Sequence, residues 1–357
     1  MAARKRVLVV GLGNMGMSHA LAYTRIDGFE VAGLCERHIN VRTLPPVLAK
    51  APRFTAFEDA LAAVKPDVVS INTWSDTHAA YAIHAMEVGA HVFVEKPLAE
   101  TVADAERVVA TAKRTGKKVV VGYILRQHPS WIRFVEIART LGAPLVFRMN
   151  LNQQSSGAQW EAHKRLLQTL SPIVDCGVHY VDVWCQITRA RPVSVHAHGA
   201  RLTEDMPAGM YNYGHFQVAF EDGSIGWYEA GWGPMMSETA YFVKDVIGPK
   251  GSVSIVMAET GGAGTRSADI NTHTKTNQIL VHHAELAPDG SLAKSDERLS
   301  TIDEPDHDGL CEREQRFLLS AIDQNLDLTD HLNDAVKSLR IVLAADESVR
   351  TGKVIAL

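Results

Sequence analysis

The chain has 357 residues, of which 46% are hydrophobic and 22% are charged, and its formal net charge at pH 7 is −5. This composition is typical of a folded globular protein with room for two domains, and it excludes an intrinsically disordered chain. No run of Lys and Arg forms a basic patch, so we expect no nucleic-acid partner. No stretch approaches the ~18 apolar residues of a membrane helix, so we expect no membrane partner.

The cysteines and the N-terminal segment indicate where the protein acts. Cys35, Cys176, Cys185 and Cys311 are scattered without a C-x-x-C pair, which argues against a disulfide framework and a structural zinc site. The basic start, Met1–Arg6, runs directly into an apolar strand pattern and a glycine turn, unlike a signal peptide. We therefore expect a cytoplasmic protein.

Short apolar runs alternate with amphipathic segments in the first third of the chain. The runs predict strands over Val7–Val10, Val31–Cys35, Val68–Asn72, His91–Val94 and Val119–Gly122. The segments between them predict helices, for example over Met15–Tyr23, Ala79–Val88 and Val102–Thr115. Strands joined by helix-length connections form βαβ units, and therefore a doubly wound parallel sheet. We assign residues 1–125 to this Rossmann-type domain.

The pattern changes after Pro129, where longer strands follow one another. Strands are predicted over Tyr213–Phe220, Ile225–Ala230, Tyr241–Ile247, Val253–Met257 and Gln278–Glu285. Turn residues such as Glu221–Gly223 and Gly248–Gly251 link them, which predicts a largely antiparallel sheet. Residues Ala258–Thr276 are rich in Gly, Thr, Ser and Ala and predict an exposed loop, and helices are predicted over Gly309–Gln324 and Asn333–Thr351. The fold class is therefore α/β, with a C-terminal α+β domain over residues 126–357.

A glycine-rich turn, Gly11-Leu-Gly13-Asn14-Met15-Gly16, follows the first predicted strand and opens a helix. In a dinucleotide site the first glycine permits the tight turn, the second admits the pyrophosphate and the third allows close packing of helix and strand. The anion then meets unpaired N–H groups at the start of the helix. We expect Gly11, Gly13, Asn14, Met15 and Gly16 to contact the cofactor; a glycine turn without a ligand is the alternative.

Glu36 lies twenty residues after Gly16, at the end of the second predicted strand. A carboxylate at this place accepts hydrogen bonds from the ribose hydroxyls of NAD and repels the 2′-phosphate of NADP. Arg37 beside it leaves NADP open, because a guanidinium can bind that phosphate or stack on the adenine. We predict NAD as the cofactor.

Two further segments carry groups suited to proton and hydride chemistry. Lys96, in Glu95-Lys96-Pro97, follows the fifth strand, and ligands of open α/β sheets bind at the carboxyl ends of strands. In Asp175-Cys-Gly-Val-His179-Tyr-Val-Asp182 the spacing places all three polar side chains on one helical face. A His is a suitable proton acceptor from an alcohol near neutral pH. The structural alternatives are a surface Lys, a capping Asp and a buried His.

These motifs together resemble the glucose–fructose oxidoreductase / inositol dehydrogenase family (Gfo/Idh/MocA) along nearly the whole chain. The resemblance rests on the glycine turn, Thr73 with His78, Glu95-Lys96-Pro97, Gly122 with Arg126 and Pro129, Asp175-x-Gly-x-His179-x-x-Asp182 and the tail Ala344–Lys353. It implies a Rossmann domain followed by an α+β domain with an open-faced sheet, through which members form homodimers or homotetramers.

The resemblance also implies a reaction, in which hydride passes between a hydroxyl-bearing carbon of a sugar, inositol or related polyol and nicotinamide. It makes Lys96, Asp175 and His179 the catalytic and substrate-binding group. Thr73, Trp74, His78 and Glu95 join Lys96 on the cofactor side. The chain departs from the family pattern at Trp74, where members commonly have Pro, and at Ser171-Pro-Ile173, where many have glycines.

A polyol needs several hydrogen-bonding partners and an apolar or aromatic wall. Further substrate-binding candidates between Gly122 and the Asp175 motif are Tyr123, Arg126, Asn152, Trp160, His163 and Lys164. The closest histidine pairs, His196-x-His198 and His282-His283, have no third ligand at convincing spacing, so we predict no metal.

Two other functions stay open for this sequence. One keeps the fold with retained NAD in an internal redox cycle, as in an epimerase or a glycosidase-like enzyme. The other is a non-enzymatic sensor of NAD(P) or a sugar. The proton acceptor predicted at His179 argues against the sensor, because sensing needs no base.

Overall fold

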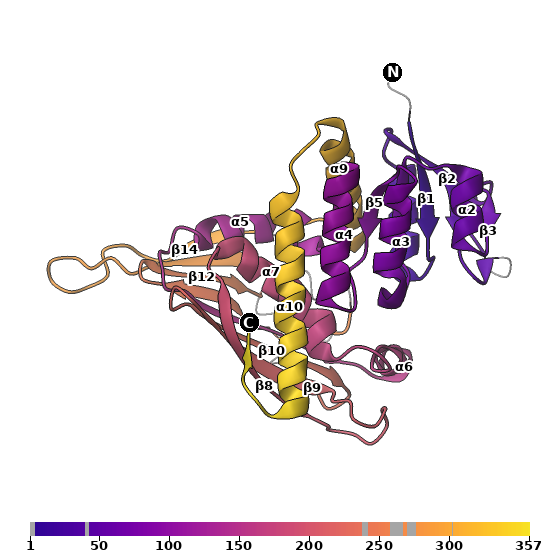
Figure 1. The fold of residues 1–357 in the computed structure, drawn as a ribbon. Helices are drawn as coiled ribbons and strands as arrows, with labels where there is room; N and C mark the ends of the chain where they lie inside the picture. Colours follow the sequence, from indigo (N-terminus) through magenta and orange to yellow (C-terminus); the bar gives the residue numbers. More distant parts are fainter. Residues whose placement is uncertain (1–3, 40–42, 238–241, 258–266, 270–275, 302) are drawn as a thin grey trace. The chain divides into compact units, whose positions relative to one another are not determined.

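A computed structural model describes residues 4–39, 43–237, 242–257, 267–269, 276–301 and 303–357. The chain divides into two compact units (Figure 1). The first contains residues 1–127 and 305–336, and the second contains residues 128–304 and 337–357. Residues 305–336 thus join the first unit although they follow the second sheet in the sequence. Most of the predicted loop, residues 258–266 and 270–275, lies outside the described residues.

The first unit is built on a six-stranded sheet with the order β3-β2-β1-β4-β5-β6, in which every pair is parallel. Its strands are β1 (Lys5–Val10), β2 (Phe29–Cys35), β3 (Arg53–Phe54), β4 (Val68–Ile71), β5 (His91–Val94) and β6 (Val119–Val121). Its helices are α1 (Asn14–Thr24), η2 (Pro46–Leu48), α2 (Phe57–Val64), α3 (Ser75–Glu87), α4 (Val102–Thr115), η3 (Ile124–Gln127), α9 (His307–Asp323) and the first turns of α10 (Thr329–Thr351). This strand order confirms the predicted Rossmann sheet.

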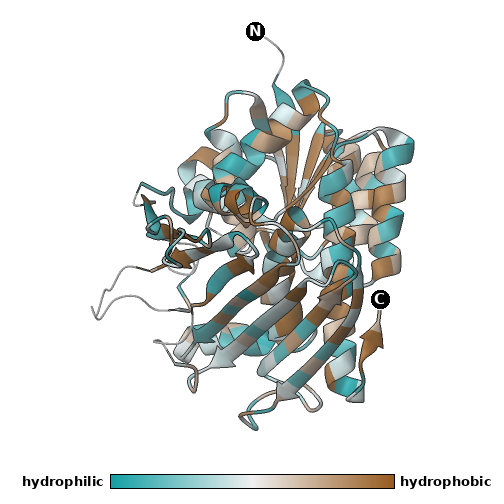
Figure 2. Ribbon diagram, turned by 90° about the vertical axis from the view of Figure 1, so that its left-hand side faces the viewer, coloured by the Kyte–Doolittle hydropathy of each residue, from teal (hydrophilic) through white to brown (hydrophobic). Residues whose placement is uncertain are grey.

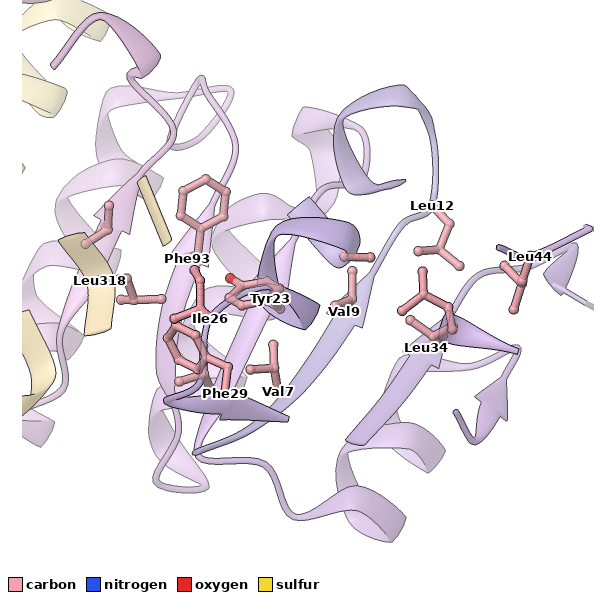
Figure 3. Close-up of a cluster of buried hydrophobic side chains, with 14 of the residues drawn as sticks. Val7, Val9, Leu12, Tyr23, Ile26, Phe29, Leu34, Leu44, Phe93 and Leu318 are labelled. Atoms are coloured by element: carbon pink, nitrogen blue, oxygen red, sulfur yellow. The ribbon is translucent and has the colours of Figure 1, made fainter. Parts of the chain in front are cut away.

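Buried aliphatic and aromatic side chains hold this sheet to its helices (Figure 3). Val7 and Val9 of β1 meet Tyr23 of α1 and Phe93 of β5 in one cluster. Leu318 of α9 joins the same cluster and is fully buried. Helix α9 is therefore part of the hydrophobic core of the first unit rather than an appendage of the second sheet.

The second unit is built on a nine-stranded sheet with the order β14-β13-β12-β11-β7-β10-β9-β8-β15. Its strands are β7 (Val146–Gln154), β8 (Pro192–Ala200), β9 (Tyr213–Phe220), β10 (Ile225–Gly233), β11 (Lys244–Gly248), β12 (Gly251–Val256), β13 (Gln278–His283), β14 (Glu297–Ser300) and β15 (Ile355–Ala356). Its helices are α5 (Pro129–Ala138), α6 (Gly157–Leu166), α7 (Pro172–Ile187) and the rest of α10. The pair β7–β10 is parallel and the other pairs are antiparallel, which confirms a largely antiparallel sheet.

Helix α7 covers one face of this sheet and packs on β7, β9 and β10. The Trp184 ring stacks on Phe147 of β7 with ring centroids 5.6 Å apart. A Cβ at Gly226 of β10 would lie 2.6 Å from the same indole, so only glycine leaves room for it. Alternation along the strands sends His196 and His198 to the other face, where both are exposed. Figure 2 shows the resulting bands of hydrophilic and hydrophobic residues along these strands.

Several predicted bounds change. The strand predicted from Tyr241 begins at Lys244, and Tyr241 itself lies outside the described residues. The helix predicted from Gly309 begins at His307, because the side chain of Asp306 caps it by accepting a hydrogen bond from the Gly309 N–H. Among the described residues, no helix is both long and apolar enough to cross a membrane.

Candidate active site

The glycine turn after β1 has the geometry that the sequence predicts. Gly11 has φ +80°, and a Cβ on Gly16 would lie 1.9 Å from the Gly11 carbonyl oxygen. A Cβ on Gly13, by contrast, would meet nothing within 4 Å. Gly11 and Gly16 are thus required by the turn itself, whereas the space over Gly13 can be filled by a ligand. Asn14 and Met15 begin α1, whose first turn carries no acidic residue, so an anion can approach its N–H groups.

Glu36 follows β2 directly and lies beside this turn. Its Oε2 accepts a hydrogen bond from the Leu12 N–H at 3.0 Å, which holds the carboxylate at the edge of the glycine turn. Arg37 next to it is exposed. The open space over Gly13, the helix start and this carboxylate fit the pyrophosphate and ribose of a dinucleotide.

The loop after β4 lies against the glycine turn, because a Cβ on Gly11 would meet the Asn72 carbonyl oxygen at 2.5 Å. Neighbouring strands β1 and β4 mark the point where the strand order reverses, and ligands of such sheets bind there. Thr73 shares a hydrogen bond with Thr77 at 2.6 Å, and Trp74 is 57% exposed. The indole is thus available to a ligand.

His78 is buried under this loop and bonds to backbone on both sides. Its Nδ1 lies 2.7 Å from the Pro97 carbonyl oxygen and its Nε2 lies 3.1 Å from that of Thr73. Burial lowers the pKa of His78, although the two carbonyl groups oppose this shift. The ring therefore ties the Thr73 loop to the segment that carries Lys96.

Glu95 is buried directly before Lys96 and holds its backbone. Glu95 Oε2 accepts the Lys96 N–H at 3.2 Å, and Oε1 lies 2.8 Å from His19 Nε2 of α1. Burial by itself would raise the pKa of Glu95, but the hydrogen bond from His19 and the positive charge of Lys96 bring it below its usual value. Glu95 is thus a positioning residue for the Lys96 segment.

Tyr123 and Arg126 lie after β6 in the first unit. Tyr123 is 1% exposed, and the Arg126 guanidinium lies 6.0 Å from the centre of its ring. Arg126 also donates to the Asp334 carboxylate at 3.0 Å, in an ion pair whose side chains are 14% and 2% exposed. These contacts give both residues a structural role besides the substrate role that we predicted.

In the second unit, helix α7 presents two of the predicted polar residues. From Pro172 to Cys185 every residue of α7 is buried except Asp175 and His179, which are partly accessible and one turn apart. Asp182, which the spacing places on the same helical face, is 1% exposed and accepts a hydrogen bond from Gln186 at 3.1 Å. Asp182 is therefore not available to a ligand as Asp175 and His179 are, because that part of the helix is buried.

Two stacked rings lie near Asp175 and form an aromatic wall. The His163 ring of α6 stacks on Trp232 of β10 with centroids 4.7 Å apart, and its Nδ1 bonds to Ser155 Oγ at 2.9 Å. Burial lowers the pKa of His163 to about 4, against an opposing effect of the Asp175 charge. The indole N–H of Trp232 donates to Gln153 Oε1 at 3.0 Å. His163 is thus a neutral imidazole near Asp175.

The other predicted substrate residues of this unit have partners of their own. Asn152 donates to Glu229. Trp160 is 8% exposed, and the Lys164 ammonium lies 5.9 Å from its ring centre. Lys164 also forms ion pairs at 2.7 Å with Asp205 and at 2.8 Å with Glu161.

Lys244, at the start of β11, was not among the predicted site residues. Its ammonium is buried, donates to the Asn150 carbonyl oxygen and lies 4.3 Å from the centre of the Tyr180 ring of α7. Burial lowers the pKa of Lys244 well below its ordinary value, while Cys176 and Glu229 oppose the shift. A lysine inside an apolar strand pattern was the available sign.

Comparison with known proteins places both units in one family. Residues 5–123 match the sequence profile described as "Oxidoreductase family, NAD-binding Rossmann fold", and residues 137–254 match the profile of the GFO/IDH/MocA C-terminal domain. The chain belongs to the Gfo/Idh/MocA oxidoreductase family. This confirms the predicted family and NAD as the cofactor of the Rossmann domain.

Among the relatives of this Gfo/Idh/MocA protein are two dehydrogenases. It is 28% identical over 200 residues to UDP-N-acetylglucosamine 3-dehydrogenase of Acidithiobacillus ferrooxidans, which covers 56% of this chain and 59% of that protein. It is 27% identical over 182 residues to inositol 2-dehydrogenase of Salmonella typhimurium, and this match covers 49% of this chain and 52% of that protein. The matched region thus spans little more than half of these relatives.

A solved structure extends the likeness of the fold to the whole chain. The WlbA dehydrogenase of Bordetella pertussis, in complex with NADH and UDP-GlcNAcA, aligns with a TM-score of 0.76 at 19% identity and covers 99% of both chains.

Proposed function

We propose that this protein is an NAD-dependent dehydrogenase that transfers hydride between a secondary alcohol of a sugar, inositol or related polyol and nicotinamide. The observation that carries the proposal is the pair Asp175 and His179, the accessible polar side chains on an otherwise buried stretch of α7. The proposal draws on the NAD-binding domain and on relatives named for action on a sugar nucleotide and on inositol.

The proposed catalytic group is Lys96, Asp175 and His179. When bound, NAD supplies the hydride acceptor. His179 takes the proton of the substrate hydroxyl, and Asp175 orients the imidazole or a neighbouring hydroxyl. The Lys96 ammonium donates a hydrogen bond to the reacting oxygen and stabilises the negative charge that develops there. Glu95 supports this step by holding the Lys96 backbone.

The ring wall of His163 and Trp232 suits the rest of a polyol. The apolar faces of the rings can pack against the C–H face of a sugar, while neutral His163 adds no charge near Asp175. The indole of Trp74 can form a second wall on the cofactor side. Glu36 favours NAD over NADP by accepting hydrogen bonds from the ribose hydroxyls.

The proposal includes a cytoplasmic homodimer or homotetramer formed through the open face of the second sheet. The exposed His196 and His198 lie on that face, which α7 does not cover. Light scattering of the purified protein, repeated with a charged residue introduced at His198, tests the interface. A monomer in both cases contradicts it.

The test of the activity follows NADH absorbance across a panel of inositols, aldoses, ketoses and sugar acids at alkaline pH. We expect turnover with at least one member, and a fall in kcat of about 10²–10⁴ in His179→Ala and in Lys96→Ala. Lys113→Ala in the last turn of α4 and His283→Ala at the end of β13, neither of which belongs to the proposed group, serve as matched controls. Near-wild-type turnover in both active-site variants rejects the residue assignment. Absence of NADH with every substrate, together with NAD released on denaturation, favours an internal redox cycle.

A further inference from the structure

One side of the first unit holds a group of buried titratable side chains that the proposed reaction does not use. Helix α9 contributes three of them at helical spacing, namely His307, Cys311 and Glu314. Cys311 follows His307 by four positions and Glu314 follows Cys311 by three, so the three side chains lie on one face of the helix. Helix α1 contributes His19, whose ring is fully buried. Helices α1 and α9 pack together, which brings the four side chains close to one another.

Their donor atoms have the identity and proximity of a metal-ligand set. One ligand atom each from His19, Cys311 and Glu314 lies within 4.8 Å of the other two. The His307 ring lies beside this group, with Nδ1 3.8 Å from the Cys311 Sγ. In a tetrahedral zinc site with bonds of about 2.0–2.3 Å, donor atoms are roughly 3.3–3.8 Å apart, so side-chain shifts of about 1 Å close the site.

Glu314 supplies an independent reason to expect a ligand here. The residue is 2% exposed, and its Oε1 has no hydrogen-bond partner among the described residues. Buried carboxyl oxygens are normally hydrogen-bonded or bound to a metal, so this oxygen requires an explanation.

One ring nitrogen of His19 is held by a carboxylate, as in many metal-binding histidines. The Gln315 amide N–H donates to His19 Nδ1 at 2.9 Å, and His19 Nε2 donates to Glu95 at 2.8 Å. A carboxylate that accepts from one ring nitrogen leaves the other for a metal and fixes the ring orientation. Turning the Gln315 amide away would release Nδ1 for this bond.

We propose that His19, Cys311 and Glu314 bind one Zn²⁺ ion, with the ring of His307 as the fourth donor. Two nitrogens, one sulfur and one carboxylate oxygen are a typical donor set for zinc. Thiolate and carboxylate together carry two negative charges, which balance the ion, and their protons pass to solvent on binding. All four positions of the tetrahedron come from protein, so the site is structural. It fastens α9 to α1 and, through His19 and Glu95, supports the segment before Lys96.

The site is tested on the full-length protein, purified without a polyhistidine tag. We expect about one zinc per chain by elemental analysis. Chelator-treated wild type should take up one equivalent of Co²⁺ and show the thiolate-to-cobalt charge-transfer band and the intense visible bands of tetrahedral cobalt. In Cys311→Ser the charge-transfer band should be lost, and in Glu314→Gln the affinity for zinc should fall at least about 10–100-fold. Cys35→Ser, which removes a buried cysteine of the same unit outside the cluster, should keep the full spectrum.

Wild-type protein that binds neither Zn²⁺ nor Co²⁺ stoichiometrically overturns the proposal, and this measurement does not depend on the folding of any variant. A charge-transfer band that persists in folded Cys311→Ser overturns it as well, because the thiolate ligand would then be another cysteine. Zinc removal should also lower the melting temperature of wild type and leave that of folded Cys311→Ser unchanged. Equal effects on both would contradict a site built on Cys311.

Discussion

Replacing Gly13 with valine should separate cofactor binding from folding. A Cβ at Gly13 enters open space, and the φ of −61° at this residue suits any amino acid. We therefore expect the melting temperature without cofactor to stay within about 2 °C of wild type, since substitutions that make no clash change stability by only about 0.5 kcal/mol. The added side chain would occupy the space that the pyrophosphate needs. Loss of one hydrogen bond to a charged phosphate, about 1.5–3 kcal/mol, raises Kd about 10- to 150-fold.

Thermal unfolding with and without NAD is the assay. At an NAD concentration 100 times Kd, binding raises the free energy of unfolding of wild type by about 2.7 kcal/mol. This corresponds to a rise in melting temperature of roughly 5–11 °C for a unit of this size. For a variant whose Kd for NAD is 100-fold higher, the same NAD concentration raises the free energy of unfolding by only about 0.4 kcal/mol and the melting temperature by about 1 °C.

Gly16→Ala is the contrasting variant. Its Cβ would lie 1.9 Å from the Gly11 carbonyl oxygen, so the backbone must move, at a cost of about 3 kcal/mol or more. We expect this variant to melt lower than wild type even without NAD. A Gly13→Val protein that loses as much stability as Gly16→Ala, or that keeps the full NAD-dependent rise in melting temperature, would contradict this prediction.

Three further predictions concern the cofactor, the ring wall and the core. Glu36→Ala should lower the ratio of kcat/KM for NAD to kcat/KM for NADP by about 10-fold, because a carboxylate that hydrogen-bonds to the ribose is lost. An unchanged ratio would show that Glu36 does not determine the preference for NAD. The pKa of His163 is lowered to about 4, so the unfolded chain binds more protons between pH 6.5 and 4 and stability falls as the pH drops through that window, by up to about 3 kcal/mol. Urea unfolding at pH 7 and pH 4.5 should show a smaller loss in His163→Gln, and an equal loss would contradict the assignment. Leu318→Ala should destabilise the first unit by about 2–5 kcal/mol in denaturant unfolding, and a cost below 1 kcal/mol would place α9 outside its core.

The parallel sheet and its cofactor turn could be predicted because their determinants are local. Helix α4 (Val102–Thr115) and strand β9 (Tyr213–Phe220) have the predicted bounds, since periodicity and a capping Thr101 or a flanking turn define each within one segment. The short strand β3 and helix α2 (Phe57–Val64) were not predicted. A two-residue strand carries no readable period, and it forms because β2 offers it a free edge.

In the candidate site, the sequence identified the segments that contain the proposed catalytic and binding residues, but not how accessible each residue is. Asp175 and His179 share an accessible face, as the four-residue spacing predicts, whereas Asp182 three residues further on is buried. Helical spacing determines which side chains share a face, but burial depends on what packs against each turn of that face. The position of Lys244 in an apolar strand pattern was a sign in the sequence, but only the packed sheet shows that its ammonium is enclosed.

The sequence by itself determined the Rossmann sheet, the glycine turn at Gly11–Gly16 and the dinucleotide cofactor, because each depends on residues close together in the chain. Only the tertiary structure decided that residues 305–336 return to the first unit, and that His19 meets Cys311 and Glu314. Nearly three hundred residues separate α1 from α9. The two helices pack together because their buried surfaces are complementary. The sequence pattern of one helix does not show which distant helix has the complementary surface.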